Sequence, residues 1–318
     1  RNPKSIMNFE KKKSSHLIAI LQALFVTFLW STSWVLIKIG LNANLPSLTF
    51  AGLRYTLAFL CLLPLVFFNQ SHLQSIKNLT KQNWLELFLL GVLFYAITQG
   101  AQFLSLSFLP ATTLTLLLNL TTITVAFYSI FSKHEKTSTI QWGGILLSII
   151  GILFYFLPLS STQSNQTLGL IAGIVGLLAN AVSSIYGRHI NSKSNINPLV
   201  VTCISMGFGG LLLLATGIST QGFGNLNTNQ WMIVAWLALV NTAFAFTLWN
   251  KTLQTLTAVE SSIINGTMLP QIAILAWLFL NETLSEKEIF GISLVLIGTL
   301  IVQLWRYIPT NKNKTPSK

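Results

Sequence analysis

The stretch LIAILQALFVTFLWSTSWVLIKI, from Leu17 to Ile39, decides the class of this protein. Lys38 is its one charged residue, and the stretch exceeds the ~20 apolar residues that a helix needs to cross a bilayer. The rest of the chain has the same character, since 52% of its residues are hydrophobic and only 8% are charged. An average soluble domain is about 25% charged. The sequence therefore predicts an all-α integral membrane protein.

Apolar windows separated by polar or proline-containing breaks predict ten transmembrane helices. They cover residues 17–39, 47–68, 84–107, 111–131, 139–158, 168–188, 198–217, 230–250, 258–280 and 287–307.

The positive charges alternate from one connection to the next. Lys and Arg occur in both terminal tails and in the second, fourth, sixth and eighth connections, whereas connections such as 160–167 and 219–230 carry none. By the positive-inside rule, both termini are cytoplasmic. We expect a multi-pass protein of a cell (inner) membrane, with an organelle membrane left open. The net charge of +12 fits cytoplasmic loops, so we expect the lipid bilayer, and no nucleic acid, as a partner.

The chain repeats itself at a shift of 147 positions. That shift lays Glu135 over Glu282 and Gly144 over Gly291, and it aligns QNW at 82–84 with NQW at 229–231. Each half would hold five helices, and because five is odd the second half would enter the membrane from the opposite side. The prediction is ten transmembrane helices as two inverted five-helix repeats. The predicted divisions are tail 1–16, repeats 17–158 and 168–307, and tail 308–318.

The repeated Glu lies in the turn between the fourth and fifth helices of each half. A structural turn or helix cap and a part in substrate binding are both open for Glu135 and Glu282. We expect the glycines that follow, Gly144 and Gly151 and their counterparts Gly291 and Gly298, to let the last helix of each half pack closely on a neighbour, as small residues do in lipid.

Several stretches resemble a known family. They are FLWSTSWVLIKIGL (28–41), YAITQGAQFLSLSFLPATTLTLLLN (95–119), the Glu135 turn, and WNKTLQTLTAVESSIING (249–266). Together they resemble EamA-type members of the drug/metabolite transporter superfamily over about residues 17–305. The resemblance implies ten helices in two inverted repeats around a central cavity, and transport of amino acids, other metabolites or drugs. The chain departs from the family at Asn180–Ala181, where many members carry an aromatic residue as this one does at Trp30.

The candidate substrate-binding residues are polar groups near the predicted midplane and aromatic residues close to them. Inverted-repeat carriers bind substrate at that depth, and polar side chains in lipid face the bundle interior. The alternatives are hydrogen bonding between helices and interfacial Trp belts. The candidates are Trp30, Trp34, Tyr95, Gln99, Gln102, Thr115, Asn119, Asn241, Trp249 and Asn265.

Three charged residues are candidates for gating or charge recognition. Lys38 and Arg54 lie toward the outer ends of the first two helices, where they could extend outward to the interface or bind a carboxylate. Glu260 lies near the cytoplasmic end of the ninth helix, where it could form a gate ion pair, carry a proton or help to start the helix.

We predict a secondary transporter of small organic metabolites, most consistent with export of an amino acid or related metabolite by alternating access. The alternatives are a multidrug, nucleobase or other solute carrier of the same fold, and a non-transporting membrane receptor. The chain lacks HExxH, Gly-x-Ser-x-Gly and Walker A motifs and contains no Asp, so we expect no enzyme and no catalytic residue. We expect a small-molecule substrate, no cofactor and no metal. A homodimer, proton coupling and facilitated diffusion are left open.

Overall fold

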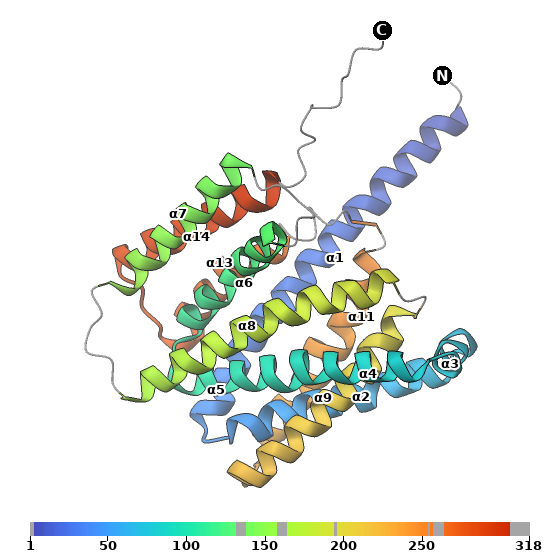
Figure 1. Ribbon diagram of the computed structural model, residues 1–318, viewed down its shortest axis with the longest axis horizontal. Coiled ribbons are helices and arrows are strands. Elements are labelled where there is room, and N and C mark those ends of the chain that lie inside the picture. The colour runs from blue at the N-terminus through green and yellow to red at the C-terminus, as the bar shows by residue number, and fades with distance from the viewer. Residues whose placement is uncertain are drawn as a thin grey trace.

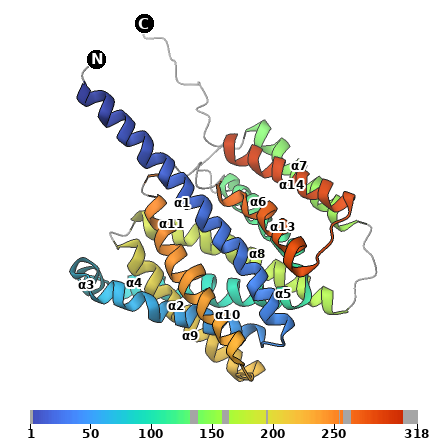
Figure 2. The same ribbon diagram turned by 180° about the vertical axis from the view of Figure 1, so that it is seen from behind.

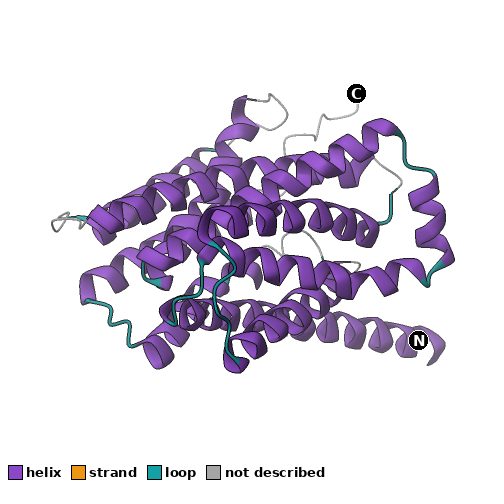
Figure 3. Ribbon diagram, turned by 90° about the horizontal axis from the view of Figure 1, so that it is seen from below, coloured by secondary structure: helices purple, strands orange, loops and turns teal. Residues whose placement is uncertain are grey.

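The described part of the chain is built from helices. The computed structural model describes residues 3–131, 138–157, 164–193, 196–253, 255–256 and 264–305. Figure 1 shows their arrangement, and Figure 3 shows helices joined by short loops, with no strand in these ranges. The elements are α1 (Pro3–Asn42), α2 (Ser47–Phe67), α3 (Gln70–Lys77), α4 (Lys81–Leu90), η1 (Gly91–Gln99), α5 (Gly100–Phe108), α6 (Ala111–Phe131), α7 (Thr139–Phe156), α8 (Ser164–Lys193), α9 (Pro198–Gln221), α10 (Thr228–Ala238), η2 (Leu239–Phe244), α11 (Ala245–Leu253), α13 (Met268–Leu280) and α14 (Glu286–Trp305).

Seven helical segments in the described residues are long and apolar enough to cross a membrane. They are His16–Asn42, Ser47–Phe67, Lys81–Phe108, Thr139–Phe156, Asn165–Gly187, Pro198–Gln221 and Thr228–Trp249. Two further apolar helices, Ala111–Val125 and Ile264–Leu280, are shorter. The predicted all-α, membrane-spanning class is therefore confirmed, while the count of ten spans stays a prediction.

Helix boundaries differ from the predicted segments in ways that follow from local sequence. α1 begins at Pro3, ahead of the predicted start at residue 17, because the polar Lys-rich segment continues the same helix. The short helix α3 was not predicted. The Asn69 side chain starts it by accepting a hydrogen bond from the Ser71 N–H group. For the ninth predicted segment, the description begins at residue 264.

Two helix starts in each half carry the same capping device at the predicted shift of 147. In each case an N-cap side chain accepts from a backbone N–H three residues later, and the side chain of that later residue accepts in return from the N-cap backbone. The capping pairs are Thr80 with Asn83 and Asn227 with Gln230, then Ser138 with Gln141 and Ser285 with Glu288. Local structure thus follows the repeat seen in the sequence.

α7 and α14 lie side by side at one end of the molecule (Figures 1 and 2). A Cβ added to Gly144 would come 2.7 Å from the Gly298 carbonyl oxygen, and one added to Gly151 would come 2.6 Å from that of Gly291. These pairings make the two helices antiparallel, with their backbones in direct contact. The expectation that the repeated glycines permit close packing is confirmed.

α2 and α9 form the corresponding close pair at the opposite end (Figure 1). A Cβ on Gly52 would come 2.4 Å from Leu214 Cα, and one on Gly217 would come 2.4 Å from the Thr49 backbone nitrogen. The main hydrophobic core lies beside this pair and includes Phe50 and Phe103, whose rings meet edge to face at 5.2 Å. Between the two glycine-rich pairs lie α1, α6, α8, α11 and α13. Of the candidate substrate-binding residues, α1, α6 and α11 hold Trp30, Trp34, Thr115, Asn119 and Trp249.

Candidate functional site

The two described π-helical segments occupy matching places in the two halves. η1 interrupts the third predicted transmembrane segment and η2 interrupts the eighth. In each, a buried threonine hydroxyl donates to the carbonyl oxygen five residues earlier: Thr98 to Leu93, and Thr242 to Leu237, both at 2.8 Å. A π-helical turn widens the helix and re-aims the side chains around it, and such turns are frequent at functional sites.

Around η1, two tyrosine side chains and one glutamine side chain meet. Tyr95 is buried, and its ring centroid lies 5.5 Å from that of Tyr55 on α2. The Tyr55 hydroxyl donates to Gln99 Oε1 at 2.7 Å. We call Tyr55, Tyr95 and Gln99 the η1 group. It joins two predicted site residues to Tyr55, which sequence reasoning missed; Gln102 follows on α5 and is partly buried.

Around η2, a charged side chain from α2 and polar groups from α1 meet. Arg54 Nε donates to Thr242 Oγ1 at 2.9 Å. Asn241 is fully buried, and its Nδ2 donates to the Leu29 carbonyl oxygen and, at 3.2 Å, to Thr32 Oγ1. Within the described residues, Asn241 Oδ1 has no hydrogen-bond partner. We call Arg54, Asn241 and Thr242 the η2 group.

Three aromatic rings meet where α1 faces η2 and α11. The Trp30 ring centroid lies 5.4 Å from that of Phe246 and 5.2 Å from that of Trp249, both in tilted arrangements. Trp30 Nε1 is buried and finds no acceptor among the described residues. We call these three residues the aromatic group. It brings together two predicted residues, Trp30 and Trp249, and its unpaired donor can serve a ligand.

The shift of 147 relates the two halves of the site residue by residue. It places Gln99 at the position of Phe246 and Gln102 at that of Trp249. The helix that contains η1 therefore contributes amides where the helix that contains η2 contributes aromatic rings. A site between them would have one polar side and one aromatic side, which suits a substrate with both kinds of group.

The remaining predicted residues that the structure describes form no hydrogen bond or ring contact with these groups. Trp34 is buried in the main hydrophobic core. Thr115 and Asn119 hydrogen-bond carbonyl oxygens of their own helix, those of Ala111 at 2.7 Å and Thr115 at 3.0 Å respectively. Asn265 is exposed. Glu260 lies outside the described residues.

Lys38 and Arg54 are the charged candidates on the first two predicted helices, and neither side chain extends freely outward. Arg54 is only 5% exposed, so the interpretation in which it reaches the outer interface is wrong, because its side chain turns inward to Thr242. Lys38 Nζ donates to the carbonyl oxygens of Leu106, at 2.6 Å, and Leu109, at 2.7 Å. Lys38 thus satisfies backbone acceptors at the end of α5.

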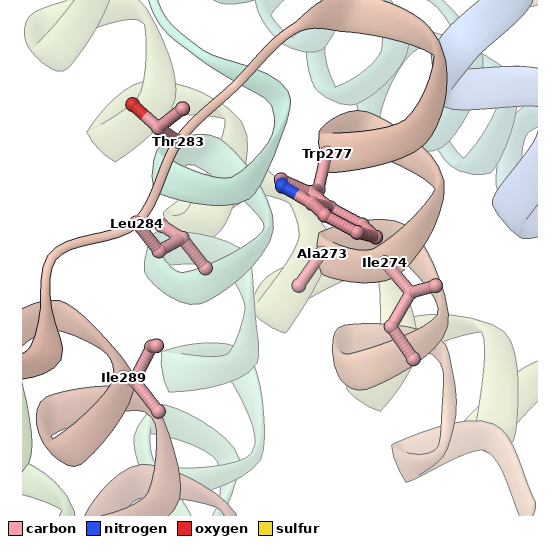
Figure 4. Close-up of a pocket in the computed structure, with 6 residues that line it drawn as sticks. All are labelled: Ala273, Ile274, Trp277, Thr283, Leu284 and Ile289. Atoms are coloured by element: carbon pink, nitrogen blue, oxygen red, sulfur yellow. The ribbon is translucent and has the colours of Figure 1, made fainter.

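A separate groove lies between α13, the connection after it and α14. Its volume is about 430 Å³, and Figure 4 shows the side chains that line it. They are Ala273, Ile274, Trp277, Thr283, Leu284 and Ile289. Trp277 is 59% exposed, as expected for a side chain on the lipid-facing surface. Because no predicted site residue lines this groove, we do not place the substrate there.

Within the described residues, no group of three or more His, Cys, Asp or Glu side chains that could hold a metal ion occurs. Cys61 and Cys203 are free thiols.

The chain is similar along most of its length to proteins that are named as transporters. It is 26% identical over 285 residues to the uncharacterized transporter YoaV of Bacillus subtilis, with 86% of this chain and 92% of YoaV covered. It is 23% identical to the S-adenosylmethionine/S-adenosylhomocysteine transporter of Chlamydia muridarum, with 90% and 91% covered. It is also 23% identical to the uncharacterized inner membrane transporter YedA of Escherichia coli K12, with 92% and 93% covered.

The fold of this chain also occurs in a solved structure. One solved crystal structure superposes with a TM-score of 0.65 at 16% identity, covering 90% of this chain and 98% of that one. The model of the EamA-like transporter family matches twice, at residues 17–157 and again at residues 167–304. Each match spans one of the predicted halves. The chain belongs to the EamA-like transporter family of the drug/metabolite transporter superfamily.

Proposed function

We propose that this protein is a secondary transporter that moves small organic metabolites across a membrane by alternating access. In this proposal ten helices form two inverted five-helix repeats, both termini are cytoplasmic, and the halves rock around a substrate held between the third and eighth transmembrane segments. Transport is the named activity of the relatives, and none of the three named above is described as an enzyme.

The observation that carries the proposal is the pair of π-helical turns, one in each half. η1 and η2 each hold a buried Thr hydrogen-bonded five residues back, and each faces side chains from α1 or α2. Such interruptions of membrane helices are favourable only where protein or substrate satisfies the altered backbone. Their matched positions support a shared task for the two halves, which binding between two repeats would supply.

The side chains of the three groups favour a substrate that combines polar and planar or apolar parts. Amides and hydroxyls line the η1 side, and three aromatic rings lie next to η2. Amino-acid export remains our first proposal. S-adenosylmethionine and S-adenosylhomocysteine also combine an amino-acid part with a planar base, and one relative is named for carrying them. A multidrug or nucleobase carrier of the same fold is the second candidate.

The test is uptake by purified protein in liposomes. The panel contains labelled amino acids, nucleobases, S-adenosylmethionine and S-adenosylhomocysteine, each measured with and without an imposed pH gradient. We expect uptake of one chemical class above that of empty liposomes, and exchange against the same compound loaded inside. Dependence on the pH gradient would indicate proton coupling, whereas independence would favour facilitated diffusion.

Two controls separate transport from leak and from receptor function. Liposomes with heat-denatured protein report leak. Folded protein that binds a panel compound yet moves none of them, in uptake or in exchange, would contradict the transport proposal and favour a non-transporting receptor.

A further inference from the structure

Arg54 is a buried cation inside a membrane-spanning helix. It lies about two turns, or roughly 10 Å, after the start of α2 at Ser47. Only 5% of its surface is exposed, and its guanidinium carbon lies 5.2 Å from the centroid of the Tyr55 ring. A charged side chain at such a site is costly and marks a functional pathway more often than a structural one.

The guanidinium has far more hydrogen-bonding capacity than the described protein uses. It carries five N–H donors, and within the described residues its one hydrogen bond runs from Nε to Thr242 Oγ1 at 2.9 Å. That partner is a neutral hydroxyl. The two terminal nitrogens, which can bind both oxygens of a carboxylate at once, find no acceptor in this part of the chain.

No described carboxylate balances the charge. The side chains of Glu86, Glu282, Glu286 and Glu288 are described, and none forms an ion pair with Arg54. Buried charges in proteins are normally paired, because removing one partner leaves a strongly unfavourable isolated charge. Among the described residues, Arg54 therefore lacks the anionic partner that a buried cation normally has.

A second unsatisfied group lies beside Thr242 in the chain. Asn241 is fully buried, and its Oδ1 has no partner among the described residues, although its Nδ2 has two acceptors on α1. An orphaned buried acceptor is unfavourable, because it has lost its hydrogen bonds to water and gained none in return. The η2 group thus combines unused cationic donors with an unused acceptor, which is the pattern of a site that awaits a ligand.

Lys38 shows what a structural cation looks like in the same protein. Its ammonium donates to two backbone carbonyl oxygens, at 2.6 and 2.7 Å, and so already has strong acceptors. Arg54 has no such partners in the described chain.

We propose that Arg54 binds the anionic group of the transported substrate, and that the substrate class is therefore small organic carboxylates. This inference rests on the proposed transport function and places the substrate carboxylate at the η2 group. The planar guanidinium binds a carboxylate through two parallel hydrogen bonds. The hydrogen bond from Nε to Thr242 meanwhile holds the guanidinium in one orientation. The substrate reaches Arg54 when the two halves move apart.

The test compares carboxylates with their amides, which have nearly the same shape but lack the negative charge. The probes are phenylacetate against phenylacetamide, butyrate against butyramide, and L-phenylalanine against L-phenylalaninamide. Binding to purified full-length protein in nanodiscs is followed by tryptophan fluorescence. For at least one pair, the wild type should bind the acid about tenfold or more tightly than the amide, as expected for a hydrogen-bonded charge.

Three variants locate the effect. R54Q should reduce the preference for the acid to about onefold, and R54K, which keeps the charge but loses the two-pronged geometry, should fall between R54Q and the wild type. K81Q removes the same unit of charge from an exposed position at the start of α4 and should keep the wild-type preference. If R54Q fails to fold, as judged by size exclusion and thermal unfolding, R54K decides.

The outcomes separate this inference from the proposed function. Equal binding of acid and amide by the wild type, no binding of any acid, or an undiminished preference in folded R54Q or, where R54Q does not fold, in R54K would overturn it. An Arg54-dependent preference in protein that transports nothing would support the anion site and count against transport. Transport of neutral or cationic compounds, with no Arg54-dependent preference, would leave the proposed function and remove the anion site.

Discussion

Glu282, in the connection between α13 and α14, caps α6 through Thr112. Its Oε2 accepts from the Thr112 N–H at 3.2 Å and from the Thr112 hydroxyl at 2.9 Å, and its Oε1 accepts from the Ala111 N–H at 2.7 Å. The carboxylate therefore satisfies free N–H groups at the start of α6 and complements the helix dipole. Of the two interpretations left open for this Glu, the helix cap is the one the geometry confirms. The repeat-related Glu135 lies outside the described residues.

Replacing Glu282 with Ala should destabilise the protein by about 1–2 kcal/mol, the usual cost of losing a side-chain cap. The measurement is thermal unfolding of purified protein in detergent. Glu286→Ala is the matched control, because Glu286 is exposed in the first turn of α14 and bonds to no other helix in the described residues. Equal stability of the two variants would show that the cap contributes nothing.

Adjacent glycines on α7 offer a sharp test of the contact with α14. Replacing Gly144 with Leu would make the new side chain clash with the Gly298 carbonyl group, because a Cβ at this position would come within 2.7 Å of that oxygen. We expect Gly144→Leu to lower the unfolding temperature strongly and reduce the yield of folded protein, since overpacking costs at least about 1–3 kcal/mol.

Gly143→Leu is the control for that experiment. A Cβ at Gly143 meets nothing within 4 Å, so the added side chain should enter lipid with little effect. Equal yields and unfolding temperatures for the two variants, measured by fluorescence-detected size exclusion, would contradict the close backbone contact.

The two threonines of the π-helical turns should differ in what they contribute. Thr98→Val removes one hydrogen bond, from the hydroxyl to the Leu93 carbonyl, and should cost about 0.5–1.5 kcal/mol. Thr242→Val removes the equivalent bond to Leu237 and also the acceptor of Arg54 Nε, and should cost about 1–3 kcal/mol more. Thermal unfolding of both variants measures the difference. A Thr98→Val loss equal to or larger than that of Thr242→Val would show that the Arg54 contact is unimportant for folding.

Much of the fold could be predicted from the sequence, because the length of a hydrophobic run and the spacing of repeated residues are local features of the chain. A run such as Leu17–Ile39 has to be a membrane helix, and the spacing of Gly144 and Gly151 has to place small residues on one face. The capping pairs that begin at Ser138 and Ser285 were not predicted, although each joins residues only three positions apart.

The partners within the site could not be predicted in the same way. The local sequence around Tyr95 or Asn241 does not distinguish a π-helical turn from an α-helix. The reason is that the extra residue per turn is stabilised by contacts with other helices. Tyr55 was missed because its hydroxyl partner, Gln99, is 44 residues away. The one sequence feature that could have indicated Tyr55 as a site residue is its position next to Arg54 on a predicted membrane helix.

Trp30 should matter for transport in a way that an equally large aromatic at the lipid surface does not. Its ring meets Phe246 and Trp249, and its buried N–H lacks an acceptor in the described chain, whereas Trp277 is 59% exposed in the groove between α13 and α14. For whichever compound the liposome assay identifies, Trp30→Ala should lower the initial uptake rate about tenfold or more, and Trp277→Ala should leave it nearly unchanged. Trp30→Phe keeps a ring but removes the donor, so an intermediate rate would assign part of the effect to the N–H group. Wild-type uptake by folded Trp30→Ala would remove the aromatic group from the substrate site and leave the η1 and η2 groups as its remaining walls.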